Sequence, residues 1–281
     1  MHLRCHMTRK IAVPDEETVP LDAISAGVVG LRVVFVNVFA VAGESGWTLI
    51  DAGLNGSAAR IRRWAESHFG DEAPNAILLT HAHFDHVGAL GELLDTWKDV
   101  MVYAHRAECP YVTGQRDYPP PDPSVGGGMM ARMSMLYPRE TIDLSGRVTE
   151  LPADDSLPGL PGWRAVHTPG HTAGHTSFFR DIDRTLIVGD AFCTTKQESF
   201  FAVATQKPEL HGPPAYFTTD WDAARDSVRR LAALRPTFIA ASHGQPMAGE
   251  VTGRALRLLA DQFDDVARPE QGRYTQTPTR G

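Results

Sequence analysis

One short stretch constrains this chain more than any other: Leu78-Leu79-Thr80-His81-Ala82-His83-Phe84-Asp85-His86-Val87-Gly88. The apolar run at 76–79 predicts a buried strand, and the six residues from His81 to His86 then carry three imidazoles and a carboxylate. His81 and His83 can point the same way from an extended turn, and the bend that follows brings Asp85 and His86 near them. A solvated turn is the alternative, but little besides coordination favours this crowding beside a core strand. The stretch predicts a metal site with room for two ions.

Three later turns repeat the pattern of a metal-competent residue where a predicted strand ends beside glycine. They are Thr168-Pro169-Gly170-His171-Thr172, Val188-Gly189-Asp190-Ala191 and Ser242-His243-Gly244. Taken singly, these residues could be a turn residue, a turn cap and a core histidine. Together with the first loop they give five histidines and two aspartates, which suits two divalent cations sharing one carboxylate. Histidine donors favour zinc, and the carboxylates leave iron or manganese open.

The composition limits which partners and substrates are expected. The 281 residues carry 27 basic and 34 acidic side chains, and the net charge of −7 argues against nucleic acid and disfavours polyanionic substrates. Three cysteines without a spacing pattern do not make a disulfide framework and fit a reducing compartment. No apolar run approaches the roughly 20 residues that a membrane span needs. The basic residues 1–10 precede no apolar signal segment, so we expect a cytoplasmic protein that acts on a small molecule.

The order of elements predicts an α/β fold. An antiparallel hairpin over residues 28–51 leads to alternating helices and strands, with a second set of short strands after residue 141. We expect a single domain over 1–268 and a frayed tail over 269–281. The segment at about 111–140, rich in proline, glycine and methionine, breaks the pattern. It could form a lid over the site, a short packed helix or the interface of a homodimer.

These motifs together resemble the metallo-β-lactamase superfamily over nearly the whole chain, in the family's order, beginning with Asp51 after the hairpin. The resemblance implies a four-layer αββα sandwich, with two mixed β-sheets face to face, helices outside and the active site along one edge. It implies a first metal held by His81, His83 and His171. It also implies a second metal held by Asp85, His86 and His243, with Asp190 as the bridge. Asp51 and His175 would support these ligands from behind.

The resemblance also implies a reaction, in which a metal-bridging hydroxide attacks the carbonyl of an ester, lactone or thioester and Asp85 shuttles the proton. The chain is similar to the lactonase and glyoxalase-II-like branch rather than to true β-lactamases, which are normally exported. Many such lactonases carry tyrosine where this chain has Cys193, and no basic carboxy-terminal segment for glutathione can be identified. β-Lactamase or phosphodiesterase activity, or metal binding without turnover, remain alternatives.

A moderately apolar substrate is expected because aromatic and methionine side chains flank the predicted site. Candidates for its walls are Phe192, Lys196, Phe200, Met129 and Met133. Lys196 could bind a substrate carboxylate or pair with Glu198.

Overall fold

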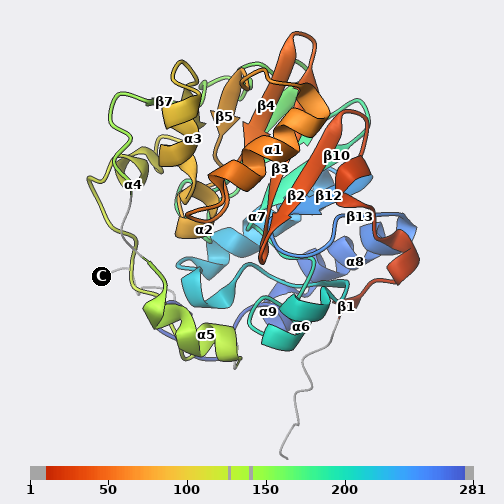
Figure 1. Ribbon diagram of the computed structural model, residues 1–281. Helices are drawn as coiled ribbons and strands as arrows, with labels where there is room; N and C mark the ends of the chain where they lie inside the picture. Colours follow the sequence, from red (N-terminus) through yellow and green to blue (C-terminus); the bar gives the residue numbers. More distant parts are fainter. Residues whose placement is uncertain (1–10, 126–127, 139–141, 276–281) are drawn as a thin grey trace, which may run out of the picture.

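The computed structural model describes residues 11–125, 128–138 and 142–275, and two β-sheets form its centre (Figure 1). The first sheet orders its strands β2, β3, β4, β5, β6 and β7, which span Val28–Val33, Val36–Gly43, Gly46–Ile50, Ala76–Leu78, Val102–Ala104 and Val148–Glu150. The second orders β13, β12, β10, β9 and β8, which span Met247–Ala248, Phe238–Ala241, Thr185–Gly189, Thr176–Arg180 and Trp163–His167. A small separate ladder pairs β1 (Ile11–Ala12) with β11 (Glu209–Leu210).

Both sheets are mixed. Strands β2, β3 and β4 form an antiparallel hairpin and meander, and β4 to β7 then run parallel. In the second sheet β10 pairs parallel with β12 and antiparallel with β9. The parallel pairs bring the carboxyl ends of β4 and β5, and of β10 and β12, to common edges, and loops at such ends commonly carry ligands.

Short and long helices complete the fold. They are α1 (Ala58–Phe69), α2 (Phe84–Val87), α3 (Leu90–Thr96), α4 (Cys109–Val112), α5 (Met129–Met133), α6 (Phe200–Thr205), α7 (Trp221–Ala233), α8 (Glu250–Asp261) and α9 (Phe263–Val266). Single 3₁₀ turns occur at Asp15–Glu17, Leu21–Ala23, Ser134–Leu136 and Ala215–Phe217. None of the helices in the described parts of the chain is both long and apolar enough to span a membrane.

Alternation along the strands builds the layers. In β4, Leu49 faces outward and packs with Ile61 of α1, whereas its neighbour Ile50 faces the second sheet. Ile50 and Phe39 meet Phe178 of β9 in an apolar layer between the sheets. On the far side of the second sheet, the outward residues of β10 and β12 pack on α7 and α8. The resulting helix, sheet, sheet, helix order confirms the predicted αββα sandwich.

The structure differs from the sequence expectations near the carboxyl end. The last helical segment is divided at Gln262 into α8 and α9. The tail expected to fray from residue 269 is held as far as Thr275, because the Tyr274 hydroxyl donates to the Pro120 carbonyl at 2.8 Å and the Arg273 amide donates to Asp122. It therefore packs on the 111–140 segment. Residues 276–281 lie outside the described part of the chain.

Candidate metal centre

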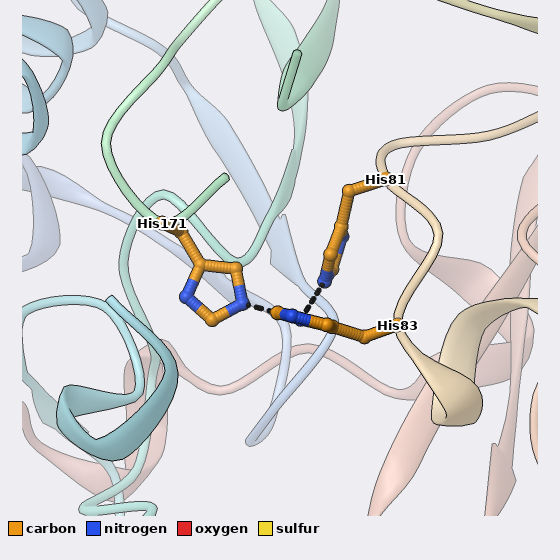
Figure 2. A group of neighbouring side chains, drawn as sticks. All are labelled: His81, His83 and His171. Carbon is orange, nitrogen blue, oxygen red and sulfur yellow. Dashed lines mark hydrogen bonds between the residues drawn. The ribbon is translucent and has the colours of Figure 1, made fainter. Parts of the chain in front are cut away.

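The loop after β5 delivers the first ligands. His83, in extended backbone, is the N-cap of α2, so Asp85 and His86 stand on the first turn of that helix, while His81 lies in the irregular segment between β5 and α2. Nε2 of His81 lies 2.9 Å from Nδ1 of His83, and Nδ1 of His83 lies 3.0 Å from Nε2 of His171 (Figure 2). The first two rings thus present different nitrogens to one point, and all three side chains are buried.

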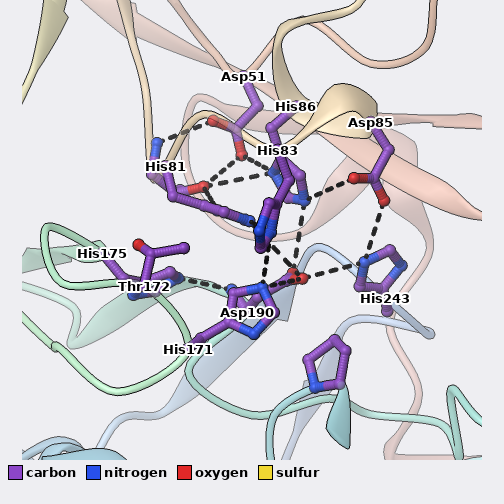
Figure 3. A network of polar contacts seen from close by, with 12 residues as sticks. Asp51, His81, His83, Asp85, His86, His171, Thr172, His175, Asp190 and His243 are labelled. Carbon is purple, nitrogen blue, oxygen red and sulfur yellow. Dashed lines mark hydrogen bonds and ion pairs between the residues drawn. The ribbon is translucent and has the colours of Figure 1, made fainter. Parts of the chain in front are cut away.

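The second sheet supplies the remaining ligands one at a time. His171 lies in the turn between β8 and β9, Asp190 follows β10 and His243 follows β12. The Asp190 carboxylate occupies the middle (Figure 3). Its Oδ2 lies 3.2 Å from Nε2 of His243 and 3.5 Å from Nε2 of His171, and its Oδ1 lies 3.6 Å from Nε2 of His86. Asp190 therefore faces both halves of the cluster.

The cluster divides into groups whose donor atoms lie close enough to share an ion. These groups are His81, His83 and His171; His81, His86 and Asp190; and Asp85, His86 and His243. Two buried atoms that could bind a metal, Nε2 of His86 and Oδ1 of Asp190, have no hydrogen-bond partner among the described residues. A buried polar atom without a partner is costly, and a cation between the two would satisfy both. The residues present therefore fit divalent metal ions.

The histidines of the first group are held in the neutral form that binds metals. Burial lowers the pKa of His83 to about 3, and the nearby His86 ring adds to the effect. Burial also places the pKa values of His81 and His171 well below the usual range for histidine. A neutral imidazole keeps a lone pair for coordination.

Hydrogen bonds behind the ligands set which ring nitrogen faces inward. Nδ1 of His86 donates to Asp51 at 2.8 Å, and Asp51 also accepts the amide and hydroxyl of Thr80 at 2.8 Å each. Nδ1 of His243 donates to the Phe35 carbonyl at 3.0 Å. In both ligands Nε2 is left for the metal, the orienting role that such partners commonly have. Asp51 sits at a positive φ of 59°, so the end of β4 turns sharply toward the site.

His175 stands behind Asp190 instead of among the ligands. Its Nε2 accepts the backbone N–H of Asp190 at 2.8 Å, and its Nδ1 bonds to the Thr168 hydroxyl at 2.8 Å. Both ring nitrogens are occupied, and burial lowers the pKa of His175 to about 3, which keeps Nε2 an acceptor. His175 thus fixes the backbone from which the central carboxylate projects.

A pocket opens above the cluster between Asp85, Asp190 and His243. Its apolar lining consists of Phe35, Phe84, Met130, Tyr137, Pro214, Tyr216 and Phe217. The 111–140 segment contributes Met130 and Tyr137, so this segment covers part of the site. Residues 126–127 and 139–140 of the segment lie outside the described part of the chain.

The side chains proposed from sequence as pocket walls lie elsewhere. Phe192 is fully buried in the core beneath α7 and α8. Phe200 is 57 % exposed, and Met129 and Met133 are 49 % and 42 % exposed. These three side chains and the half-buried Lys196 are not among the described residues that line the pocket. The neighbour of Met129, Met130, takes the expected position because its side of α5 faces inward.

Sequence reasoning also missed several residues of the site. Phe84 lies within the histidine motif, but its side chain has no atom that can bind a metal, so the motif did not indicate it as a site residue. The Pro213-Pro214-Ala215-Tyr216-Phe217 run is an aromatic cluster that forms a 3₁₀ turn beside the pocket. Glu108, a carboxylate with 0 % exposure, bonds to both histidine loops. For Phe84 and the 213–217 run, the only signal in the sequence was their apolar and aromatic character. Glu108 had no such signal.

Comparison with known proteins agrees with this geometry. The profile of the metallo-beta-lactamase superfamily matches residues 31–243. The chain is 46 % identical over 244 residues to the probable metallo-hydrolase YflN of Bacillus subtilis, covering 85 % of this chain and 92 % of that protein. It is 33 % identical over 115 residues to a hydroxyacylglutathione hydrolase of Xylella fastidiosa, covering 40 % of this chain and 31 % of that one.

Solved structures share the fold. A metallo-beta-lactamase family protein of Thermus thermophilus, TTHA1429, superposes with a TM-score of 0.59 at 22 % identity, covering 86 % of this chain and 81 % of that one. TTHA1623, solved in a di-iron-bound form, gives a TM-score of 0.52 at 26 % identity, covering 83 % and 96 %. The predicted enzyme class, a metal-dependent hydrolase, is confirmed by these relatives. The chain belongs to the metallo-β-lactamase superfamily.

Proposed function

We propose that this enzyme is a dinuclear hydrolase that cleaves an ester, lactone or thioester of a small, moderately apolar acid. The observation that carries the proposal is the central position of Asp190. Its carboxylate lies within 3.2 to 4.0 Å of ring nitrogens of His81, His86, His171 and His243, which come from both halves of the cluster. One carboxylate facing both halves is the arrangement that a pair of ions requires.

The two ions would be held by separate sets of side chains. One set is His81, His83 and His171 and the other is Asp85, His86 and His243, with Asp190 between them. Bound there, two divalent cations would lower the pKa of a shared water and polarise the substrate carbonyl. The donor chemistry favours zinc. Asp85 lines the pocket and its side chain keeps 9 % exposure, which supports a role in carrying a proton to the leaving group.

The pocket walls favour an uncharged acyl group. Seven of the lining residues are aromatic, methionine or proline, and no lysine or arginine is among the described residues that line this pocket. A β-lactam or a phosphodiester brings an anionic group, which such walls would not pair. A thioester remains inside the proposed class, and the likeness to a hydroxyacylglutathione hydrolase favours testing it.

The test combines metal analysis with a substrate panel. The protein, loaded with zinc, manganese or iron, is assayed on short aryl esters, lactones, thioesters, a β-lactam and a phosphodiester. A matched pair isolates charge: an aryl butyrate against the aryl half-ester of succinic acid, which is similar in length but ends in a carboxylate. We expect two ions per chain and a preference for the neutral ester of about tenfold or more.

Three results would contradict the proposal. Preference for the charged ester or the phosphodiester would remove the assigned substrate class. Metal binding without turnover of any substrate would favour a non-catalytic metal protein. One ion per chain at saturating metal would remove the dinuclear centre.

A further inference from the structure

A buried glutamate beside the metal centre ties together three separate parts of the chain. Glu108 precedes α4 and its side chain is completely inaccessible to solvent. Its carboxylate accepts the Ala82 amide at 3.1 Å, the Thr172 hydroxyl at 2.7 Å and the Gly174 amide at 2.8 Å. The Tyr118 hydroxyl donates to the same carboxylate.

The partners of Glu108 show what it connects. Ala82 lies between the ligands His81 and His83, and Thr172 follows the ligand His171 directly. One carboxylate therefore bonds to both loops whose three histidines form the first group of donors. This side chain thus links two loops that belong to different sheets.

Tyr118 extends this connection to the 111–140 segment. Its hydroxyl also accepts the Ala82 amide at 3.0 Å, and its ring lies 4.4 Å from the His83 ring, centroid to centroid. On the other side it stacks on Tyr111 at 4.0 Å. The orientation of His83 thus depends on a tyrosine that the segment over the pocket supplies.

Close packing leaves little freedom in this arrangement. A Cβ atom at Gly174 would lie 2.8 Å from both Cγ and Oε1 of Glu108, so only glycine allows the carboxylate to reach the amide. Burial raises the pKa of Glu108, and the four donated hydrogen bonds act in the opposite direction. Removal of the carboxylate would take away the acceptor of the Thr172 hydroxyl and of the Gly174 amide, and burying donors without an acceptor is costly.

We propose that Glu108 is a positioning residue for one of the two metal ions, holding the His81–His83 loop and the His171 turn at the spacing that coordination requires. The inference rests on the proposed metal centre but not on its substrate. Partners behind metal ligands commonly change metal affinity by about 10–100-fold when they are lost.

The chain offers a matched control in Glu17. Its carboxylate also accepts two backbone amides and a threonine hydroxyl, from Val251 at 2.9 Å and from Thr252 at 2.6 and 2.7 Å. It also packs against a glycine, Gly249, where a Cβ would lie 2.3 Å from its Cδ. These bonds hold the start of α8 and involve none of the ligand loops.

The experiment compares Glu108→Gln, Tyr118→Phe and Glu17→Gln with the parent protein. Metal-free protein is titrated with zinc against a chromophoric chelator, and the melting temperature of each metal-free protein is measured separately. We expect Glu108→Gln to weaken one of two zinc sites by about 10–100-fold and Tyr118→Phe to weaken the same site less. Glu17→Gln should lower the melting temperature while both zinc affinities stay within about twofold of the parent.

The outcomes separate cleanly. Equal zinc affinities in Glu108→Gln and Glu17→Gln, at a similar loss of melting temperature, would overturn the positioning role and leave the proposed function intact. A parent protein that binds no zinc, manganese or iron would instead overturn the proposed function. If Glu108→Gln does not fold, Tyr118→Phe and Thr172→Val decide the question, since each removes a single donor.

Discussion

The seven candidate metal ligands form the floor of the active site, and the apolar residues that line the pocket form its walls. Different interactions hold the floor and the walls in place. On the floor, several of the candidate ligands have a defined hydrogen-bond partner behind them, such as Asp51 behind His86 and the Phe35 carbonyl behind His243. The walls are held by ring packing, with Phe84 5.5 Å from Tyr137 and Phe217 6.1 Å from Tyr137 between ring centroids. Hydrogen bonds fix a geometry to a few tenths of an ångström, whereas apolar packing tolerates exchange of side chains. The floor therefore sets the reaction, and the walls are free to set the substrate.

The largest effect should come from the centre of the floor. Asp190→Ala removes the carboxylate that faces four of the histidines. We expect loss of at least one bound ion and a fall in kcat/KM of about a thousandfold or more, since metal-ion stabilisation amounts to several kcal/mol. Metal analysis and steady-state kinetics measure both, with the exposed Asp226→Ala as control. Full metal content with undiminished activity would show that the floor does not work as described.

Metal removal should lower stability as well as activity. Without cations, Nε2 of His86 and Oδ1 of Asp190 stay buried with no hydrogen-bond partner in the described part of the chain. Metal at 100 to 1,000 times its dissociation constant would stabilise the fold by about 3–4 kcal/mol, which corresponds to a melting-temperature shift on the order of 10 °C for a domain of this size. Scanning calorimetry before and after chelation, and after reloading with zinc, tests this. If chelation leaves the melting temperature unchanged, this result argues against metal ions bound in the folded protein.

A support of the floor should matter less than its centre. Asp51→Asn replaces an acceptor of three donors by an amide that must turn its NH₂ toward one of them. We expect metal affinity at the ion bound by His86 to fall by about 10–100-fold. The zinc titration described for Glu108 measures it, and a loss confined to the opposite ion would show that the two supports have been assigned to the wrong sites.

A wall substitution should change substrate preference and spare the metals. Phe217 lines the pocket and its ring lies 4.7 Å from that of His83. Phe217→Leu should raise the activation free energy for the preferred apolar ester by about 1–2 kcal/mol, because apolar contacts of the acyl group are lost. This corresponds to a fall in kcat/KM of roughly 5- to 30-fold. Two ions per chain should remain. A matching loss on every substrate in the panel would point to damage of the floor.

The smallest effect belongs to a residue that the sequence placed in the walls. Phe200 begins α6, none of whose residues is buried, and its side chain is 57 % exposed. We expect Phe200→Ala to change kcat/KM by less than about twofold and the free energy of unfolding by less than about 0.5 kcal/mol. A larger kinetic effect would mean that substrate extends over α6 beyond the pocket.

The contrast between floor and walls also explains what could be predicted from the sequence. The candidate ligands are four residues of one loop and three residues that lie beside glycine near strand ends, so local chemistry in the sequence indicates them. The resemblance implied the αββα layers, and the structure explains them through strands such as β4, whose successive residues Leu49 and Ile50 belong to different apolar layers. The walls depend instead on which side of a short turn faces inward. Phe192 directs its ring into the core and Phe217 lies at the pocket, and no periodicity distinguishes them.

The support residues were predictable only in part. The family resemblance implied Asp51, and His175 was indicated by its position four residues beyond His171. Glu108 lies 22 residues beyond His86 in an ordinary helix start, and its role appears only when the fold brings Ala82 and Gly174 to it. Similarly, the contact of Tyr274 with Pro120 joins chain segments far apart in sequence.

The close approach of Gly174 to Glu108 makes the pair a marker for sorting relatives. A Cβ at position 174 would also lie 2.9 Å from the backbone nitrogen of Glu108, so a chain that evolves a side chain there must both give up the glutamate and move the turn that follows His171. The two positions should therefore change together among descendants of this lineage. Chains that keep the seven candidate ligands but lack both residues must space their histidine loops by other contacts. Their metal affinity would then depend on those other contacts.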